Sequence, residues 1–303
     1  MIDLAALSSL RAVDQHGSVV GAAQASGYTP SAVSQQIKKL ERQVGLPLLE
    51  RVGRGVVLTP QGRTLVDNGG RLLEDLERLQ SRLHGDADQV TGHLRVATFA
   101  TALRGLVAPV ARSLMDTHPD LRLTLVEHEP WASIDLVASG QAELAIAHSW
   151  GDVPLVVPDH LTGQVLLRDR ADVIVPDGHP LAARSRVSPR DLVDEDWIAT
   201  AEGTICRQWL RRMYDGTGHA PRIAHVAHDF DGHLALVAAG LGIALVPRLG
   251  RSPLPRGTVA VAAHRPDPTR EIVAVHRASM ADSPAVRCVL GALGSPSALA
   301  RPR

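Results

Sequence analysis

The residues best suited to chemistry lie close together near the start of the chain, in the segment TPSAVSQQIKKLER at residues 29–42. If this segment is a helix, residues three and four apart share a face. That face presents hydroxyl, amide and cationic groups from Ser31, Gln35, Lys38 and Arg42, with Ser34 on its flank. Hydroxyl and amide groups hydrogen-bond to the edges of bases, and cations bind phosphates. We therefore expect this face to contact double-stranded DNA.

The same segment carries the signals of a helix. Thr29 can cap the free N–H groups of a first turn, and Pro30 suits the first helical position and belongs to the expected DNA-binding set. An apolar stripe recurs at helical spacing opposite the polar face, at Val33, Ile37, Leu40 and Val44. An ordinary surface helix would present mixed Glu and Lys pairs. Serine and glutamine in their place favour DNA reading.

Elements on both sides fit this interpretation. The segment SVVGAAQASG predicts a short helix with small residues that permit close packing, followed by a glycine turn, which together form a helix-turn-helix. An earlier helix with leucines at positions 4, 7 and 10 closes the core. After residue 45, LLERVGRGVVLTP predicts two short strands, which form a wing with Arg54 at its tip.

The wing adds to a local positive charge. Residues 34–63 contain six cations against two acidic residues, a net charge of +4, whereas the whole chain is neutral. Such a patch is typical of a nucleic-acid contact. We therefore add Arg51 and Arg54 to the expected DNA-binding residues.

A long helix should follow, because Thr59 and Pro60 repeat the start signal of the earlier helix. Its apolar positions alternate by four and three residues, at Leu65, Gly69, Leu72, Leu76, Leu79 and Leu83. This stripe either lies on its own domain or is covered by a partner subunit. We favour a homodimer or homotetramer, because two-fold dimers present paired reading helices about one DNA turn apart.

Composition limits the class of protein. The length of 303 residues suits two or three domains, and 45% apolar with 21% charged residues is ordinary for a globular protein. The longest nearly uncharged run, at residues 234–247, is too short to cross a bilayer, and the start lacks a signal-peptide pattern. We expect a cytoplasmic protein with no membrane partner, in which Cys206 and Cys288 are thiols.

The segment AAQASGYTPSAVSQQIKKLERQVGLPLLERVGRGVVLTPQG closely resembles the N-terminal region of LysR-type transcriptional regulators. That family has, in this order, a run of small residues, P-S-x-x-S-x-x-I-x-x-L-E, G-x-x-L-x-x-R and T-x-x-G. Here the second pattern runs from Pro30 to Glu41 and the third from Gly45 to Arg51. The wing tip RVGRGVV departs from many relatives, which have an aromatic or another basic residue near it.

The resemblance implies a multidomain architecture. It predicts an all-α winged helix-turn-helix at residues 1–59, a dimerising linker helix and hinge at 60–89, and an effector-binding domain at 90–303, commonly assembled as a tetramer. That last domain resembles periplasmic solute-binding proteins, which hold ligand between two α/β lobes.

The second half of the sequence reads independently as α/β. Repeated strand and helix patterns predict parallel sheets, with strands at LRVATF, LRLTLVE and ELAIAH and a helix at residues 103–115 that breaks near Pro109. A second set of strands follows at ADVIVP, WIAT, IAHVA and GIALVP, and EIVAVH returns to the first set. We expect lobe I at about residues 90–164 and 267–303, and lobe II at about 165–266.

Ligands bind such sheets beyond the carboxyl ends of the strands. The candidate effector contacts that follow predicted strands are Thr98, Phe99, Ala100, Thr101, Trp131, His148, Thr200, Thr204 and Phe230, with Trp150, His128 and Asp229 nearby. The chain has two phenylalanines, and both fall at these strand ends, which favours a planar or apolar effector unless they fill the lobe cores. No cofactor is expected besides the small-molecule effector.

Other classes of function have weaker signals. The sequence lacks the G-x-S-x-G, H-E-x-x-H and phosphate-loop patterns of common enzymes. A metal sensor could use His225, His228 and His233, but no cysteine pair assists, and we expect no metal. The remaining alternatives are a redox sensor based on Cys206, which lies beside Arg207, and a solute-binding protein without a DNA role.

The favoured hypothesis is a regulator in which closure of the lobes reorients the paired winged domains. Ligand would then change DNA bending or contact with RNA polymerase, rather than affinity alone.

Overall fold

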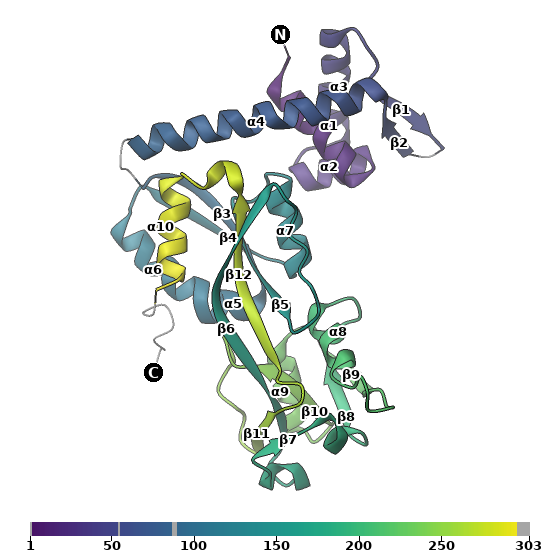
Figure 1. Cartoon of the computed structure of the whole chain (residues 1–303), viewed down its shortest axis with the longest axis vertical. Helices are drawn as coiled ribbons and strands as arrows, with labels where there is room; N and C mark the ends of the chain where they lie inside the picture. Colours follow the sequence, from purple (N-terminus) through teal and green to yellow (C-terminus); the bar gives the residue numbers. More distant parts are fainter. Residues whose placement is uncertain (1, 54, 87–89, 296–303) are drawn as a thin grey trace.

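The structure is a computed structural model that describes residues 2–53, 55–86 and 90–295. A small N-terminal domain and one long helix lie across the end of an elongated, two-lobed α/β domain (Figure 1). The predicted fold class is confirmed. Within the described residues, no helix combines the length and the apolar character needed to cross a bilayer.

The N-terminal domain is a winged helix-turn-helix. Its elements are α1 (Leu4–His16), α2 (Val19–Ser26), α3 (Pro30–Val44), β1 (Leu49–Val52) and β2 (Gly55–Leu58). Each of the three helices is preceded by a capping residue whose side chain accepts backbone N–H bonds, namely Asp3, Ser18 and Thr29. Apolar residues from all three helices and both strands enclose one core, as the sequence periodicity predicts.

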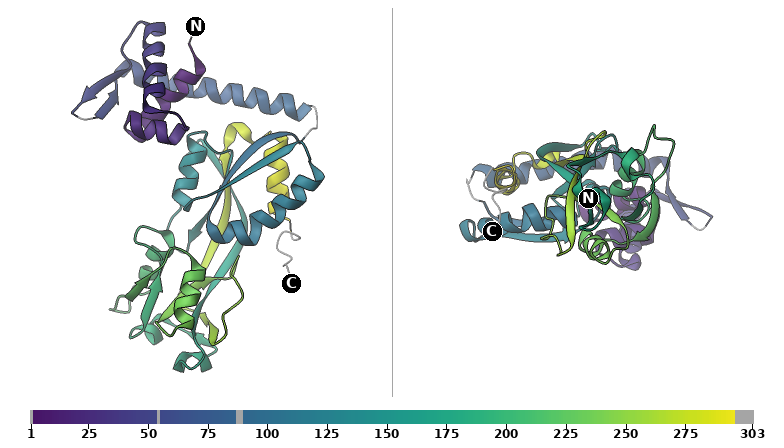
Figure 2. Two further views of the ribbon diagram at one scale, coloured as in Figure 1. Left: turned by 180° about the vertical axis from the view of Figure 1, so that it is seen from behind. Right: turned by 90° about the horizontal axis from the view of Figure 1, so that it is seen from below.

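The linker helix α4 (Pro60–Asp86) follows directly. It extends one residue past Gly85, where the expected hinge sequence begins; the middle of that hinge, residues 87–89, lies outside the described residues. Seen from behind in Figure 2, α4 crosses the end of lobe I, where it lies against η4 (Ala278–Met280) and α10 (Pro284–Leu293).

Lobe I is built on a sheet with the strand order β4-β3-β5-β12-β6. Its strands are β3 (Gly92–Thr98), β4 (Leu121–Glu127), β5 (Leu144–Trp150), β12 (Thr269–Arg277) and the first part of β6 (Leu161–Pro176). Strands β3, β4 and β5 are parallel, whereas β12 is antiparallel to both β5 and β6. The helical segments of this lobe are α5 (Ala100–Ala102), η1 (Leu103–Val107), α6 (Ala108–Thr117), α7 (Pro130–Ala138), η4 and α10.

Lobe II continues the same sheet through β10 (Ile243–Pro247), β8 (Asp196–Ala199) and β9 (Arg222–Val226). Strand β11 (Thr258–Ala263) also pairs with β6 and with the short β7 (Arg186–Val187). Its helical segments are η2 (Pro180–Ala183), η3 (Pro189–Leu192), α8 (Ile205–Arg212) and α9 (Phe230–Ala238).

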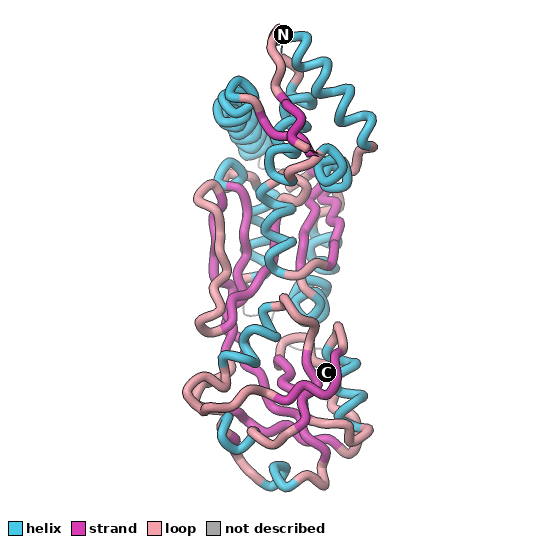
Figure 3. The backbone as a smooth tube through the Cα atoms, turned by 90° about the vertical axis from the view of Figure 1, so that its right-hand side faces the viewer, coloured by secondary structure: helices cyan, strands magenta, loops and turns pink. Residues whose placement is uncertain are grey.

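Strand β6 passes from one lobe into the other without a break. Its first part pairs with β12 as far as Arg170, and its second part, from Ala171 on, pairs with β10 and β11. The lobe boundary therefore lies inside this strand, a few residues beyond the expected position at 164/165. Figure 3 shows the long strands that run from the upper lobe into the lower one.

The helix expected at residues 103–115 differs from the prediction. The helical path starts earlier, at Ala100, and reaches Thr117 through a π-helical turn at Leu103–Val107, so Pro109 does not break it. Pro109 stands in the first turn of α6, a position that proline tolerates. In the π turn, Gly105 touches lobe II, because a Cβ there would lie 2.4 Å from the backbone nitrogen of Gly250. Such π turns occur often at functional sites.

Candidate nucleic-acid interface and inter-lobe site

The polar face of α3 points away from the domain. Val33, Ile37 and Leu40 are buried, which leaves the opposite face in solvent. On that face Pro30, Ser31, Gln35, Lys38 and Arg42 are exposed and Ser34 is half-buried. An open groove of about 1200 Å³ runs along this face to the turn at Leu46 and Pro47. The side chains predicted to contact DNA are thus held on a rigid helix and are accessible to it.

The cations of this domain divide into two kinds. Lys39 is bound within the fold, since its Nζ lies 2.6 Å from Oδ2 of Asp3, and the hydrogen bond from Lys39 lowers the pKa of Asp3. In the part of the chain that the structure describes, Lys38, Arg42 and Arg51 form no ion pair. Arg54, predicted at the wing tip, lies outside the described residues. Among the described residues, three of the predicted DNA-binding cations are therefore available to phosphates.

Two residues of the motifs hold the wing in place. The carboxylate Oε1 of Glu41 accepts hydrogen bonds from the backbone N–H groups of Leu48 (2.8 Å) and Leu49 (3.3 Å). A Cβ at Gly62 would lie 2.2 Å from the carbonyl oxygen of Leu48, so this position of α4 fits only glycine. The wing, the reading helix and the linker helix therefore meet at Leu48 and hold one another in position.

The stripe on α4 is covered only in part. Gly69 packs on α1, where a Cβ would lie 2.7 Å from both Cδ atoms of Leu7. Leu65 is half-buried beside the same core. Further along, Leu72, Leu79 and Leu83 are exposed. The first half of the stripe thus lies on its own domain, and the second half presents leucines to solvent.

The ends of the lobe I strands carry a cluster of rings around a buried arginine, which we call the inter-lobe group: Phe99, His148, Trp150, Trp209 and Arg270. The ring of His148 packs edge-on against Phe99 and Trp150, with centroids 4.6 and 6.0 Å away. Trp150 in turn stacks on Trp209 of lobe II. The Cζ of Arg270 lies 5.1 Å from the Phe99 centroid and 5.5 Å from that of Trp150, within cation–π range. The group joins the two lobes.

Arg270 is only 1% exposed and is fixed by polar partners from two elements, β6 and α5. Its Nη2 lies 2.8 Å from Oδ2 of Asp169 on β6 and donates to Oγ1 of Thr101 at 2.8 Å. Oδ1 of Asp169 also accepts from the backbone N–H of Leu249 (3.0 Å). Asp169 therefore neutralises Arg270, and Thr101, a predicted effector contact, is engaged by Arg270.

The other predicted contacts in lobe I surround this group. Thr98 is fully buried, and its hydroxyl has a long contact of 3.5 Å to the carbonyl oxygen of Phe99. Ala100 starts α5. Trp131 is half-buried and packs against the apolar cluster that contains Trp150 and Trp209. Burial, followed by the charge of Arg270, lowers the pKa of His148 well below its ordinary value, so this histidine is neutral.

In lobe II, Thr200 and Thr204 meet at the start of α8. Their hydroxyl oxygens are 2.8 Å apart, and Thr204 Oγ1 accepts from the backbone N–H of Arg207 (3.2 Å). Phe230 does not lie at a cleft edge as expected. Its ring is 9% exposed and packs in the core beneath α9 with Ile174 and Ile198, because Phe230 lies on the same buried face of α9 as Leu234 and Val237.

Within the described part of the chain, histidines and cysteines do not gather into a metal centre. No cluster of three metal-binding side chains occurs among residues 2–53, 55–86 and 90–295. His233 is buried, its Nε2 lies 3.2 Å from the carbonyl oxygen of Ala227, and burial lowers its pKa. Cys206 and Cys288 are free thiols that pack against the cores of different lobes.

Comparison with known proteins decides the family. Residues 4–63 match the bacterial regulatory helix-turn-helix of the lysR family, and residues 87–295 match the LysR substrate binding domain. The chain belongs to the LysR family. It is a DNA-binding transcriptional regulator with an effector-binding domain.

Two relatives illustrate this similarity. The LysR-family chain is 31% identical to the small neutral protease regulatory protein of Streptomyces coelicolor, over 77% of this chain and 70% of that one. It is 27% identical to the transcriptional dual regulator GltC of Bacillus subtilis, over 80% of each. Full-length OxyR from Pseudomonas aeruginosa shares the fold, with a TM-score of 0.70 and 20% identity over 97% of this chain and 95% of that one.

Several residues of this LysR-family protein were missed by sequence reasoning. Arg270 and Asp169 are 101 positions apart and meet only in the folded sheet. Trp209 lies mid-helix in α8, where a buried tryptophan is ordinary. The detectable signal was Arg270 itself, because an arginine next to the apolar run at residues 272–275 needs a buried partner if the strand lies inside a sheet.

Proposed function

We propose that a small-molecule effector binds between the two lobes of this regulator and changes how the linker helix is held against lobe I. The geometry of the DNA-bound oligomer would change as a result. Altered DNA bending, and altered contact with RNA polymerase, would then carry the signal in the cytoplasm. The observation that supports this proposal is a contact between Glu77 on α4 and Arg277 on β12.

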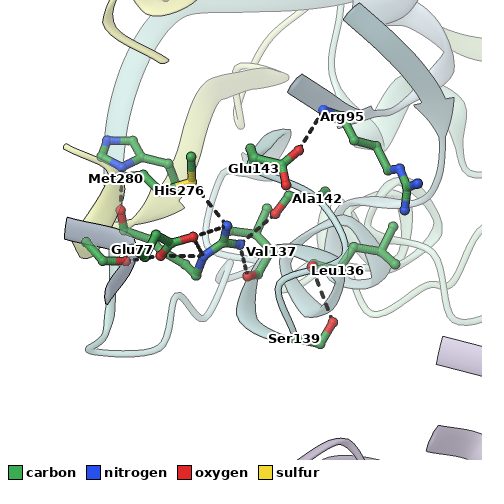
Figure 4. Close-up of polar contacts among 11 residues, drawn as sticks. Glu77, Arg95, Leu136, Val137, Ser139, Ala142, Glu143, His276 and Met280 are labelled. Atoms are coloured by element: carbon green, nitrogen blue, oxygen red, sulfur yellow. Dashed lines mark hydrogen bonds and ion pairs between the residues drawn. The ribbon is translucent and has the colours of Figure 1, made fainter. Parts of the chain in front are cut away.

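The contact is closely fitted (Figure 4). Arg277 Nε lies 3.0 Å from both carboxylate oxygens of Glu77, and its Nη2 donates to Oε1 at 2.7 Å. The hydroxyl of Ser279 donates to Oε2 of the same carboxylate. The remaining nitrogen of Arg277, Nη1, donates to the carbonyl oxygens of Val137 (2.8 Å) and Ala142 (2.7 Å). Burial acts to raise the pKa of Glu77, but the bonds and charge of Arg277 outweigh it, and the net pKa is lowered.

Strand β12 connects this contact to the inter-lobe group. Arg270 stands near its start and Arg277 at its end, seven residues and roughly 23 Å away along an extended strand. The strand pairs with β5 on one side and with β6 on the other, with a register shift against β6 between Ile272 and Val273. A ligand that moves Arg270 would therefore act on Glu77 through one element.

The exposed leucines of α4 support an oligomer. Leu72, Leu79 and Leu83 are apolar and accessible on one stripe, and the proposed homodimer or homotetramer would bury them. Because Glu77 lies on the same helix, a change at its contact with lobe I would alter the position of the partner as well.

The test is a footprint of the full-length protein on the DNA beside its own gene. We expect Glu77→Gln to protect the same half-sites but to change the length of protection and the DNA bend. Asp75→Asn is the control, since Asp75 lies on the same helix and pairs with Arg78 at the surface. Identical protection and bend angle in wild type and Glu77→Gln would refute the coupling, while absence of any protected site would refute the DNA role on that promoter.

A redox function for Cys206 has less support. Burial raises the pKa of its thiol to about 12, although the charge of Arg270 acts in the opposite direction. Reactive cysteines need a stabilised thiolate. We therefore retain a bound effector as the proposed signal.

A further inference from the structure

A short segment that follows β10 of lobe II, residues 248–251 with the sequence RLGR, contacts both lobes. We call it the crossing segment. The backbone N–H of Arg248 donates to the carbonyl oxygen of Arg170 (2.8 Å), the last residue of β6 that pairs with β12. The next residue, Leu249, packs against the apolar cluster of lobe I. The crossing segment therefore lies beside the point where β6 passes from one lobe into the other.

Two arginines of the crossing segment bind one buried carboxylate of lobe II. Asp172 stands on the part of β6 that pairs with β10, and it is 4% exposed. Its Oδ1 accepts from Nη2 of Arg248 (2.7 Å), and its Oδ2 accepts from Nε of Arg248 and from Nη1 of Arg251 (both 2.9 Å). Burial acts to raise the pKa of Asp172, but the hydrogen bonds from the two arginines outweigh it, and the net pKa is lowered. An ionised carboxylate thus holds both ends of the segment.

The middle of the crossing segment lies directly on the backbone of lobe I. Gly250 has a φ of +63°, and a Cβ there would lie 2.1 Å from the carbonyl oxygen of Thr101. From the other side, a Cβ at Gly105 would lie 2.4 Å from the backbone nitrogen of Gly250. Arg104 adds a hydrogen bond, since its Nε donates to the carbonyl oxygen of Gly250 (3.1 Å). The contact needs glycine on both surfaces, and it fixes the segment against the π turn of lobe I.

A second aspartate of β6 holds the crossing segment from the lobe I side. Oδ1 of Asp169 accepts from the backbone N–H of Leu249 (3.0 Å), while its Oδ2 binds Arg270. Asp169 and Asp172 stand on opposite sides of the point, between residues 170 and 171, at which β6 changes its neighbours. Bending β6 there changes the distance between two anchors of one short segment. The segment therefore resists rotation of one lobe against the other.

We propose that the crossing segment is a clamp that fixes the angle between the lobes, and that the lobes rotate only when it separates from the π turn. Leu249 and Gly250 are the parts that leave lobe I, whereas the two arginines keep the segment on Asp172. Such a contact is either docked or undocked, because closely packed surfaces do not deform gradually. The inference concerns the lobes alone and does not rest on the proposed function.

The test is hydrogen exchange of the full-length protein, measured by mass spectrometry. Asp172→Asn removes the charge that holds both arginines, so the crossing segment should undock. We expect exchange to become about tenfold faster at residues 248–251 and also at residues 100–107 of lobe I, a change that matches the loss of hydrogen bonds to a charged group. Exchange in α8 of lobe II and in α10 of lobe I should stay as in wild type. Faster exchange in lobe I distinguishes a clamp from a residue that stabilises lobe II alone.

Gly250→Ala tests the same contact by shape. The added methyl group meets Thr101, so the crossing segment must lift from the π turn while its ion pairs remain, and exchange at residues 100–107 should again become faster. Gly218→Ala is the matched control, because Gly218 also has a positive φ, +78°, but no atom lies within 4 Å of its Cβ.

The control for the charge is Arg168→Gln, since Arg168 lies on the same strand as Asp172 and pairs with Glu271 at the surface. Both control variants should exchange like wild type at residues 100–107. If Asp172→Asn fails to fold, Arg251→Gln removes one of the two arginines and should give the same pattern with a smaller increase.

Three results would overturn the proposal. They are faster exchange that is confined to residues 248–251 in Asp172→Asn, unchanged exchange at residues 100–107 in Gly250→Ala, and an equal increase along the whole chain, which would mean a loss of global stability without release of a clamp. The proposed function fails by a different result, an unchanged DNA footprint in Glu77→Gln, so the two can be told apart.

Discussion

The indole of Trp209 in lobe II lies nearly parallel to the indole of Trp150 in lobe I, with centroids 6.3 Å apart and an interplanar angle of 16°. The next residue, Gly151, has a φ of +54°, and a Cβ there would lie 2.2 Å from Cζ3 of Trp209. The lobes are therefore in contact at a point where only glycine fits.

Gly151→Ala should force the two lobes apart at this point. The added methyl group meets Trp209, and the left-handed backbone conformation adds strain, for a combined cost of about 1–3 kcal/mol. We expect an apparent melting temperature a few degrees lower and a larger maximum dimension in small-angle X-ray scattering. Gly178→Ala is the control, since no atom lies within 4 Å of its Cβ. Equal scattering profiles for both variants would contradict the close contact.

Gln35→Ala and Lys38→Ala should affect DNA binding differently. Gln35 offers an amide to a base edge, so its loss should flatten the preference at one base pair by about 1–3 kcal/mol. Lys38 offers a charge to phosphate, so its loss should weaken binding to all sequences and reduce the salt slope by about 1. Selection from a random DNA pool and titrations at several salt concentrations measure the two effects.

Arg112→Ala controls for the loss of a surface cation, because Arg112 is exposed on α6 of lobe I and pairs with Asp116. Its binding should match wild type. If Gln35→Ala keeps the wild-type sequence preference, the reading face of α3 is assigned wrongly.

The Glu77 contact should depend on pH in acid. The folded-state pKa of Glu77 is lowered from its ordinary value of 4.5, so its contribution to stability is fully present above that value and is lost as the pH falls through the folded-state pKa. The difference in melting temperature between wild type and Glu77→Gln should therefore be largest near neutral pH and disappear in acid. If the difference in melting temperature grows as the pH falls, the pKa of Glu77 is not lowered by folding, and the prediction is wrong.

The winged domain could be predicted in detail because its signals are local. The cap at Thr29, the proline after it and the stripe of Val33, Ile37 and Leu40 specify α3 within fifteen residues. The sequence also placed the polar face of this helix correctly in solvent. Local signals do not tell how far a helix continues, and α4 runs through Gly85 because a single glycine costs a helix only about 1 kcal/mol and does not by itself end it.

The inter-lobe group could be predicted only in part. Strand ends identified three of its members, Phe99, His148 and Trp150, because the carboxyl ends of parallel strands meet at one edge. Arg270 lies near the amino end of β12, which is antiparallel to β5 and therefore brings its amino end to the same edge of the sheet. A rule about the carboxyl ends of strands does not include such a residue. Phe230 was misplaced for a related reason: its position after β9 is near a strand end, but the rotation of α9 turns the ring into the core.

The uninterrupted course of β6 restricts how the regulator can move. Two domains joined by loops can swing through wide angles, whereas here any opening has to bend a strand whose neighbours change from β12 to β10 and β11 at the point of bending. We expect the lobes to open by a small angle only and to return to the closed position, because bending β6 strains its hydrogen bonds. A small displacement of this kind suits a sensor that acts on the distant helix α4, since a continuous strand passes on most of the movement of one lobe to the other.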